Sequence, residues 1–190
     1  MIDLINFKYH DLKNQLIGLA AEADPEKKSE LIAGMQRELE KYRPEHKTGN
    51  KVLDTLIAGK TTRLRNSDIK FTCVADGTIL SDIHVTDICS IFGNALDNAI
   101  EYEAQVEDPE NRIIHMTLAA RQGYIFIEVS NYIEAPIRMK GGMPQTTKQD
   151  KRLHGYGVKS IRYTAEKYNG SLTYTQHDHL LQMKVLIPQV

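Results

Sequence analysis

Four polar side chains recur at helical spacing near the middle of the sequence. Asn94, Asp97, Asn98 and Glu101 stand at i, i+3, i+4 and i+7, so they share one face of a helix. Asn and Asp are poor helix-interior residues because their short side chains compete for backbone hydrogen bonds. A solvated face is one explanation, and the spacing alone leaves it open. The other explanation is chemical, because side chains at i and i+4 project the same way and can address one ligand.

A second face of the same segment is apolar and predicts the helix that positions these residues. We expect this helix to start near Thr86-Asp87 and to run to about Gln105. Its hydrophobic residues recur at steps of three and four, which is the spacing of a face packed on a core. They are Ile88, Ile91, Phe92, Ala95, Leu96, Ala99 and Ile100.

The paired asparagines resemble the N box of the GHKL ATP-binding superfamily, which includes sensor histidine kinases. The resemblance implies that Asn98 is a magnesium ligand and that Asn94 lies beside the triphosphate. Side-chain carbonyl oxygens suit Mg2+, a hard ion that shares phosphate oxygens. The resemblance also places Asp97 among the nucleotide-binding residues, so ATP and Mg2+ are the expected ligands.

A glycine-containing stretch precedes a second predicted helix. In the sequence His154-Gly155-Tyr156-Gly157-Val158-Lys159-Ser160, glycines allow backbone N–H groups to approach a phosphate, and a helix N-terminus favours an anion. A plain loop hinge would look the same. The stretch resembles the G2 box of GHKL proteins, which implies nucleotide contacts from His154, Gly155, Tyr156 and Gly157. Lys148, Lys151 and Arg152 are candidate phosphate contacts in the preceding loop, although each alone is more typical of a surface charge.

A histidine with acidic and amide neighbours lies near the start of the chain, in the sequence His10-Asp11-Leu12-Lys13-Asn14. A neutral imidazole is a nucleophile near neutral pH, and an adjacent carboxylate can accept its ring proton. A lone exposed histidine usually has no such role. The run resembles the H box of histidine kinases, which implies that His10 is the phosphoacceptor, Asp11 the base and Asn14 a further catalytic residue.

One box departs from the wider GHKL pattern. The G1 box normally reads Asp-x-Gly-x-Gly, and its Asp accepts a hydrogen bond from the adenine amino group. Here the same place reads Val129-Ser130-Asn131-Tyr132-Ile133-Glu134, without glycines. The carbonyl oxygen of Asn131 can still accept that bond, although without charge. The boxes together are closest to those of peptide-sensing receptor kinases that pair with LytTR-type response regulators.

The chain has 190 residues and a formal net charge of −1, which predicts no general attraction to nucleic acid or to an anionic membrane. Cys73 and Cys89 are expected to be reduced core residues, which fits a cytoplasmic location. No apolar run approaches the length of a membrane span. We expect the chain to be the intracellular part of a receptor whose sensor region is absent from this sequence.

The predicted organisation has two parts. Residues 1–46 read as two helices with heptad spacing, which would form a four-helix bundle in a homodimer. Residues 47–190 should form the ATP-binding domain, so the fold class is α+β: a two-layer α/β sandwich preceded by a helical hairpin. Thr48-Gly49-Asn50 should open a helix, and residues 132–153 should form a long loop. Strands are expected around 69–73, 114–120 and 125–129, and a final hairpin follows a helix at 157–168.

The sequence therefore predicts an autokinase that transfers the ATP γ-phosphate to His10 and then to an aspartate of a response regulator. Asp11 and Asn14 are also suited to dephosphorylating that regulator. Two alternatives stay open. One is a phosphorelay phosphotransferase whose degenerate ATP domain binds no nucleotide, which the missing G1 glycines favour. The other is a dimeric docking module that neither binds ATP nor accepts phosphate.

Overall fold

The computed structural model describes residues 24, 28–29, 32, 47–144 and 156–189. The chain divides into two units, Met1–Arg43 and Pro44–Val190. The predicted residues His10, Asp11 and Asn14 lie outside the described residues, so the phosphoacceptor hairpin stays a prediction. The second unit holds the sheet and the helices that position the predicted nucleotide site.

Helix α4, Val85–Glu103, is the central helix of this unit. His84 caps it, because its Nδ1 accepts a hydrogen bond from the Thr86 N–H at 3.3 Å. The apolar face predicted from the sequence is confirmed, since its seven members are at most 4% exposed: Ile88, Ile91, Phe92, Ala95, Leu96, Ala99 and Ile100. The helix begins one residue before the predicted start and ends two residues before the predicted end.

One five-stranded sheet packs against this helix, in the order β1-β2-β3-β7-β6. Its strands are β1 (Lys70–Ala75), β2 (Ile113–Arg121), β3 (Tyr124–Tyr132), β6 (Ser171–His177) and β7 (Leu180–Pro188). β1 is parallel to β2, and the other neighbours are antiparallel. The predicted turn at Gln122-Gly123 is confirmed, because both residues have positive φ, at 50° and 80°. Alternate residues of β2, β3 and β7 fill the core, as their period of two requires.

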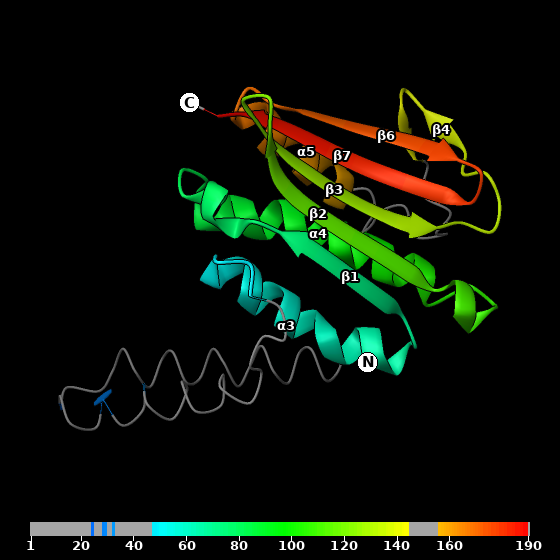
Figure 1. Cartoon of the computed structure of the whole chain (residues 1–190), viewed down its shortest axis with the longest axis horizontal. Helices are drawn as coiled ribbons and strands as arrows, with labels where there is room; N and C mark the ends of the chain where they lie inside the picture. The colour runs from blue at the N-terminus through cyan, green and yellow to red at the C-terminus, as the bar shows by residue number, and fades with distance from the viewer. Residues whose placement is uncertain (1–23, 25–27, 30–31, 33–46, 145–155, 190) are drawn as a thin grey trace. The chain divides into compact units, whose positions relative to one another are not determined.

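Two further helices accompany α4 on the same side of the sheet, as Figure 1 shows. α3, Lys51–Asn66, packs beside α4, and α5, Tyr156–Lys167, packs against α4 and β6. The predicted opening of α3 is confirmed: the Asn50 side-chain oxygen accepts the N–H groups of Val52 and Leu53 at 3.0 and 3.1 Å. The result is the two-layer α/β arrangement expected from the sequence.

The segment predicted as one long loop contains a short hairpin. β4, Met139–Lys140, pairs with β5, Met143–Pro144, across Gly141 and Gly142. Both glycines have positive φ, at 58° and 74°, a conformation that most residues avoid. No hydrophobic period marked these strands, because two residues are too few to show one. The following residues, 145–155, lie outside the described part, and with them the predicted contacts Lys148, Lys151, Arg152, His154 and Gly155.

The prediction that Cys89 belongs to the core is wrong, since its side chain is exposed. Cys89 stands one residue, or roughly 100° of rotation, beyond the buried Ile88, so it leaves the apolar face. Cys73 is half-buried, and burial raises the pKa of its thiol to about 11. Both cysteines are free thiols. Among the described residues, no helix is long and apolar enough to cross a membrane.

Candidate functional site

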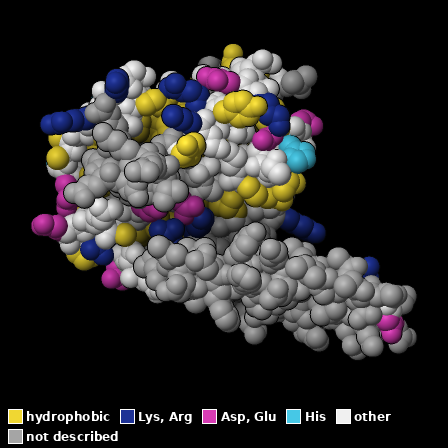
Figure 2. All heavy atoms as spheres, turned by 180° about the vertical axis from the view of Figure 1, so that it is seen from behind, with side chains coloured by type: hydrophobic (Ala, Val, Ile, Leu, Met, Phe, Trp, Pro, Cys, Tyr) yellow, Lys and Arg dark blue, Asp and Glu magenta, His cyan; other side chains and the backbone are white. Residues whose placement is uncertain are grey.

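A cavity of about 680 Å³ lies between α4, α5 and the ends of β3, β6 and β7. Figure 2 shows the helix side of the molecule, where hydrophobic side chains lie next to Lys and Arg side chains. The apolar lining is supplied mainly by Ala95, Ala99, Val106, Val129, Ile137, Met143, Leu181 and Met183. The polar lining includes Asn98, Glu101, Asn131, Glu134, Lys159 and Arg162. A mainly apolar cavity with a few polar groups is the usual form of a small-molecule site.

Asn94 and Asn98 lie where α4 meets the start of α5. Asn98 lines the cavity, and Asn94 is half-buried against the first turn of α5. The Nδ2 of Asn94 donates to the Ser90 carbonyl at 2.6 Å, which turns its Oδ1 toward Gly157. A Cβ built on Gly157 would stand 3.2 Å from this Oδ1, so a glycine permits the close approach. The structure thus brings together Asn94, Asn98 and Gly157.

Two hydroxyl contacts hold the two helices in this register. Ser90 Oγ lies 2.8 Å from Ser160 Oγ and 3.1 Å from Thr164 Oγ1, so a side chain of α4 bonds to two successive turns of α5. Thr164 is only 3% exposed, and buried hydroxyls require such partners. These bonds fix the start of α5 relative to the asparagines of α4.

Asp97 lies elsewhere, although the resemblance placed it in the nucleotide site. Its carboxylate bonds to Lys60 Nζ at 2.7 Å and to Arg63 Nη1 at 3.0 Å, both on α3. It is not among the residues that line the cavity. Helical geometry accounts for the difference, because Asp97 is rotated roughly 100° from its neighbour Asn98. Asp97 therefore joins α3 to α4.

Asn131 lies at the end of β3, is 5% exposed and lines the cavity. Its Nδ2 donates to Glu103 Oε1 at 3.1 Å and to the Tyr132 carbonyl at 2.8 Å. Both partners are acceptors, so the amide nitrogen must face them. Its Oδ1 accepts no hydrogen bond from any residue that the structure describes, and it is left for a ligand.

Glu103 is the functional candidate that the sequence reasoning missed. It is 0% exposed at the end of α4, and its Oε2 accepts the Ile113 N–H at 3.1 Å. Burial raises the pKa of this carboxyl to about 7, although its hydrogen bonds and Arg112 favour the charged form. The signal was present in the sequence: Glu103 stands four residues after Ala99 and seven after Leu96, in phase with the apolar face. A charged residue in that phase predicts a buried carboxylate.

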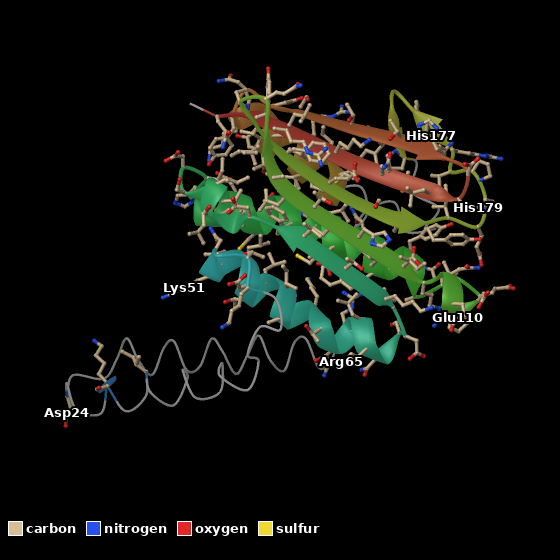
Figure 3. The ribbon with its side chains drawn as sticks, viewed as in Figure 1. Asp24, Lys51, Arg65, Glu110, His177 and His179 are labelled. Atoms are coloured by element: carbon tan, nitrogen blue, oxygen red, sulfur yellow. The ribbon has the colours of Figure 1, made fainter. Side chains whose placement is uncertain are left out.

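The residues that follow Asn131 are also held by α4 and the terminal hairpin. The Glu134 N–H donates to Tyr102 Oη at 3.3 Å, and the ring of Tyr132 stacks on His179 at 5.4 Å between centroids. Figure 3 labels His177 and His179 at the turn between β6 and β7, within the predicted final hairpin. These side-chain contacts therefore position the backbone after Asn131, where the G1 glycines are absent.

Among the described residues, the basic side chains that line the cavity come from α5. Lys159 and Arg162 line it, and Lys159 Nζ lies 5.9 Å from the centroid of the Tyr156 ring. Tyr156, predicted to bind nucleotide, is 69% exposed and is not among the lining residues. Lys159 belongs to the predicted G2 stretch, whereas Arg162 lies beyond it, and neither was predicted as a nucleotide contact.

Comparison with known proteins identifies the class. The GHKL domain family matches residues 83–188, more than half of the chain, and the chain belongs to this family. Its fold is that of histidine kinase catalytic domains. The catalytic domain of histidine kinase ThkA, in a nucleotide-free form, is 19% identical with a TM-score of 0.56, and the match covers 74% of this chain and 91% of that chain. A second nucleotide-free form, obtained with 1,2-propanediol, is 18% identical with a TM-score of 0.56, covering 74% and 93%.

Two further comparisons add no argument. The Acinetobacter baumannii histidine kinase AdeS matches over 97% of this chain and 96% of its own, but at 11% identity and a TM-score of 0.48. A sequence search of curated proteins found no match. The solved structures therefore support the fold.

Proposed function

We propose that this chain is the catalytic region of a cytoplasmic two-component histidine kinase that binds Mg2+–ATP in the cavity and phosphorylates His10. The observation that carries the proposal is the Asn131 amide, whose nitrogen is engaged and whose oxygen is left for a ligand in a mainly apolar cavity. An acceptor in such surroundings suits the amino group of adenine.

The polar groups farther from Asn131 are placed to contact the phosphates of a nucleotide whose base meets Asn131. Asn98 stands five residues before Glu103 on α4, which is about 7 Å along the helix axis, so the asparagine pair lies away from the Asn131 end. Asn98 and Asn94 would hold Mg2+, which when bound neutralises phosphate charge. Gly157 permits close approach at the start of α5, and Lys159 and Arg162 supply positive charge.

The proposed chemical step transfers the γ-phosphoryl group of ATP to a ring nitrogen of His10. The neutral ring nitrogen of His10 attacks the γ-phosphorus, the bond to the ADP oxygen breaks, and Asp11 accepts the ring proton. The phosphoryl group then passes to an aspartate of a response regulator, for which the LytTR type is the proposal. Asp11 and Asn14 would also serve the reverse task, as a regulator phosphatase. Residues 1–46 would form the homodimer.

Calorimetric titration of the full chain with a non-hydrolysable ATP analogue tests the binding. We expect saturable binding that weakens when Mg2+ is removed. No binding at millimolar nucleotide would overturn the proposal and favour the phosphorelay alternative, which the absent G1 glycines support.

Incorporation of label from γ-labelled ATP tests the acceptor. His10→Gln should abolish labelling, and the matched control His115→Gln, an exposed histidine on β2, should leave it unchanged. Labelling that persists in His10→Gln would remove His10 from the mechanism. A wild-type chain that binds ATP without becoming labelled would exclude the docking module, which binds no ATP, and would overturn the proposed autophosphorylation.

A further inference from the structure

We propose that Glu103 is a positioning residue that fixes the Asn131 amide so that the cavity offers a purine only an acceptor, selecting 6-amino over 6-oxo purine nucleotides. The inference rests on the proposed function, because it assumes that the base of a nucleotide meets Asn131. It concerns a residue of α4 that does not itself line the cavity.

The first step is the orientation of the Asn131 amide. A carboxamide can turn over and exchange its donor and acceptor sides, so its polarity depends on its neighbours. Here both Nδ2 hydrogens have acceptors, Glu103 Oε1 at 3.1 Å and the Tyr132 carbonyl at 2.8 Å. Turning the amide would set its oxygen against two oxygens. The polarity of the cavity wall is therefore set by these two acceptors.

The second step is the orientation of Glu103. Its carboxyl group is fully buried, and it receives the Ile113 N–H at 3.1 Å on the oxygen that Asn131 does not use. The Tyr132 N–H further favours its charged form. Every neighbour that bonds to the group is a donor, so the ionised form of Glu103, which prevails above pH 7, accepts from Asn131 as well. The Tyr132 carbonyl belongs to the backbone, which leaves Glu103 as the side chain that determines the amide's polarity.

The third step is the consequence for the base. The 6-amino group of adenine donates hydrogen bonds, whereas the 6-oxo group of hypoxanthine or guanine accepts them. Against the Asn131 oxygen, a 6-oxo purine places two acceptors together and leaves both desolvated without a hydrogen. Such mismatches typically change affinity by about tenfold to a hundredfold. The cavity should discriminate by about that factor.

The test compares ADP with inosine diphosphate, two Mg2+-bound nucleotides that share sugar and phosphates. The wild-type chain should bind ADP about ten to a hundred times more tightly. In Glu103→Gln, the glutamine oxygen is needed by the Ile113 N–H, so its Nε2 faces the Asn131 nitrogen. Asn131 then loses its fixed orientation, and the ratio of the two affinities should fall several-fold. Equal loss for both ligands would show a merely structural role and would overturn the inference.

A second variant reverses the pair instead of breaking it. In the double variant Glu103→Gln with Asn131→Asp, the introduced glutamine donates to one oxygen of the introduced carboxylate, and the other oxygen again presents an acceptor to the cavity. The hydrogen bond to the Tyr132 carbonyl is lost, so the comparison is with Glu103→Gln and not with the wild-type affinity. Discrimination should recover relative to Glu103→Gln. A double variant that discriminates no better than the single one would contradict the proposed pairing.

A measurement on the wild-type chain covers the case in which Glu103→Gln does not fold. The two Nδ2 protons of Asn131 should exchange slowly with solvent in nuclear magnetic resonance spectra, because both are hydrogen-bonded. Exchange at the rate of an exposed carboxamide would overturn the inference. If the wild-type chain binds neither nucleotide, the proposed function fails together with it. If it binds both nucleotides equally, only the inference fails.

Discussion

Replacing Glu103 with glutamine should remove a pH dependence from the stability of the protein. The carboxyl group is fully buried, and burial raises its pKa from 4.5 to about 7. In the unfolded chain the group returns to its ordinary pKa. Between these values the folded state keeps a proton that the unfolded state has lost, so folding is favoured at low pH and the advantage disappears as pH rises through the folded-state pKa.

The size of the effect follows from the difference between 4.5 and about 7. At 1.36 kcal/mol per unit of pKa, the free energy of unfolding should fall by about 3 kcal/mol across this window. The pKa of about 7 already includes the groups that face Glu103, because Asn131 and the Ile113 N–H donate to it and Arg112 attracts it. Tyr102, whose pKa is raised mainly by burial, is the other titratable neighbour on α4 and stays neutral in this window.

Urea unfolding followed by circular dichroism, at intervals from pH 5 to 8, measures the slope. Glu103→Gln also loses a hydrogen bond at every pH, so the readout is the difference in slope between variant and wild type and not the absolute stability. That difference cancels every contribution that the two chains share. The matched control is Glu110→Gln, whose glutamate side chain is 80% exposed and which should keep the wild-type slope. Parallel curves for wild type and Glu103→Gln would refute the reasoning.

Two further substitutions test the helix contacts. Gly157→Ala sets a Cβ 3.2 Å from the Asn94 oxygen, so it should displace that side chain and lower Mg2+–nucleotide affinity about tenfold. The control is Gly59→Ala, because nothing lies within 4 Å of a Cβ at that position. It should leave affinity unchanged and stabilise α3 by about 0.5–1 kcal/mol. Calorimetry measures both, and equal affinities in the two variants would contradict the close approach. Asp97→Asn removes the ion pairs to α3 and should lower the unfolding free energy by at most ~1 kcal/mol, because the carboxylate side chain is 38% exposed. The loss measured by urea unfolding should shrink in high salt, and a loss independent of salt would exclude an ionic origin.

The fold could be predicted from the sequence where its elements carry a local period. The apolar face of α4 and the alternation in β2, β3 and β7 each depend on residues a few positions apart in the sequence. The Gln122-Gly123 turn is likewise a local motif. The hairpin of β4 and β5 is too short for any period. Sheet order was not predicted, because the parallel pairing of β1 with β2 joins segments about forty residues apart.

The sequence could predict only those features of the site that depend on residues close together in the chain. Helix spacing predicted that Asn94 and Asn98 share one face of α4, whereas their proximity to Gly157 was expected only from the resemblance to the N and G2 boxes. The pairing of Asp97 with Lys60 depends on how α3 lies against α4, which no local pattern records. The bond between Glu103 and Asn131 likewise joins residues 28 positions apart. A carboxylate in phase with an apolar face indicated burial, but it did not indicate its partner.

The same bond bears on the alternative in which a degenerate domain binds no nucleotide. An Asn in place of the G1 Asp looks like a loss of charge when the sequence is read position by position. In the structure Glu103 supplies a carboxylate that accepts a hydrogen bond from Asn131 and does not line the cavity. A second carboxylate in place of the Asn131 amide would set two buried carboxyl groups about 3 Å apart, and they could not both ionise at neutral pH. Asn131 avoids that repulsion and still has an oxygen to offer, so the substitution is compatible with a working adenine site and does not by itself favour the relay.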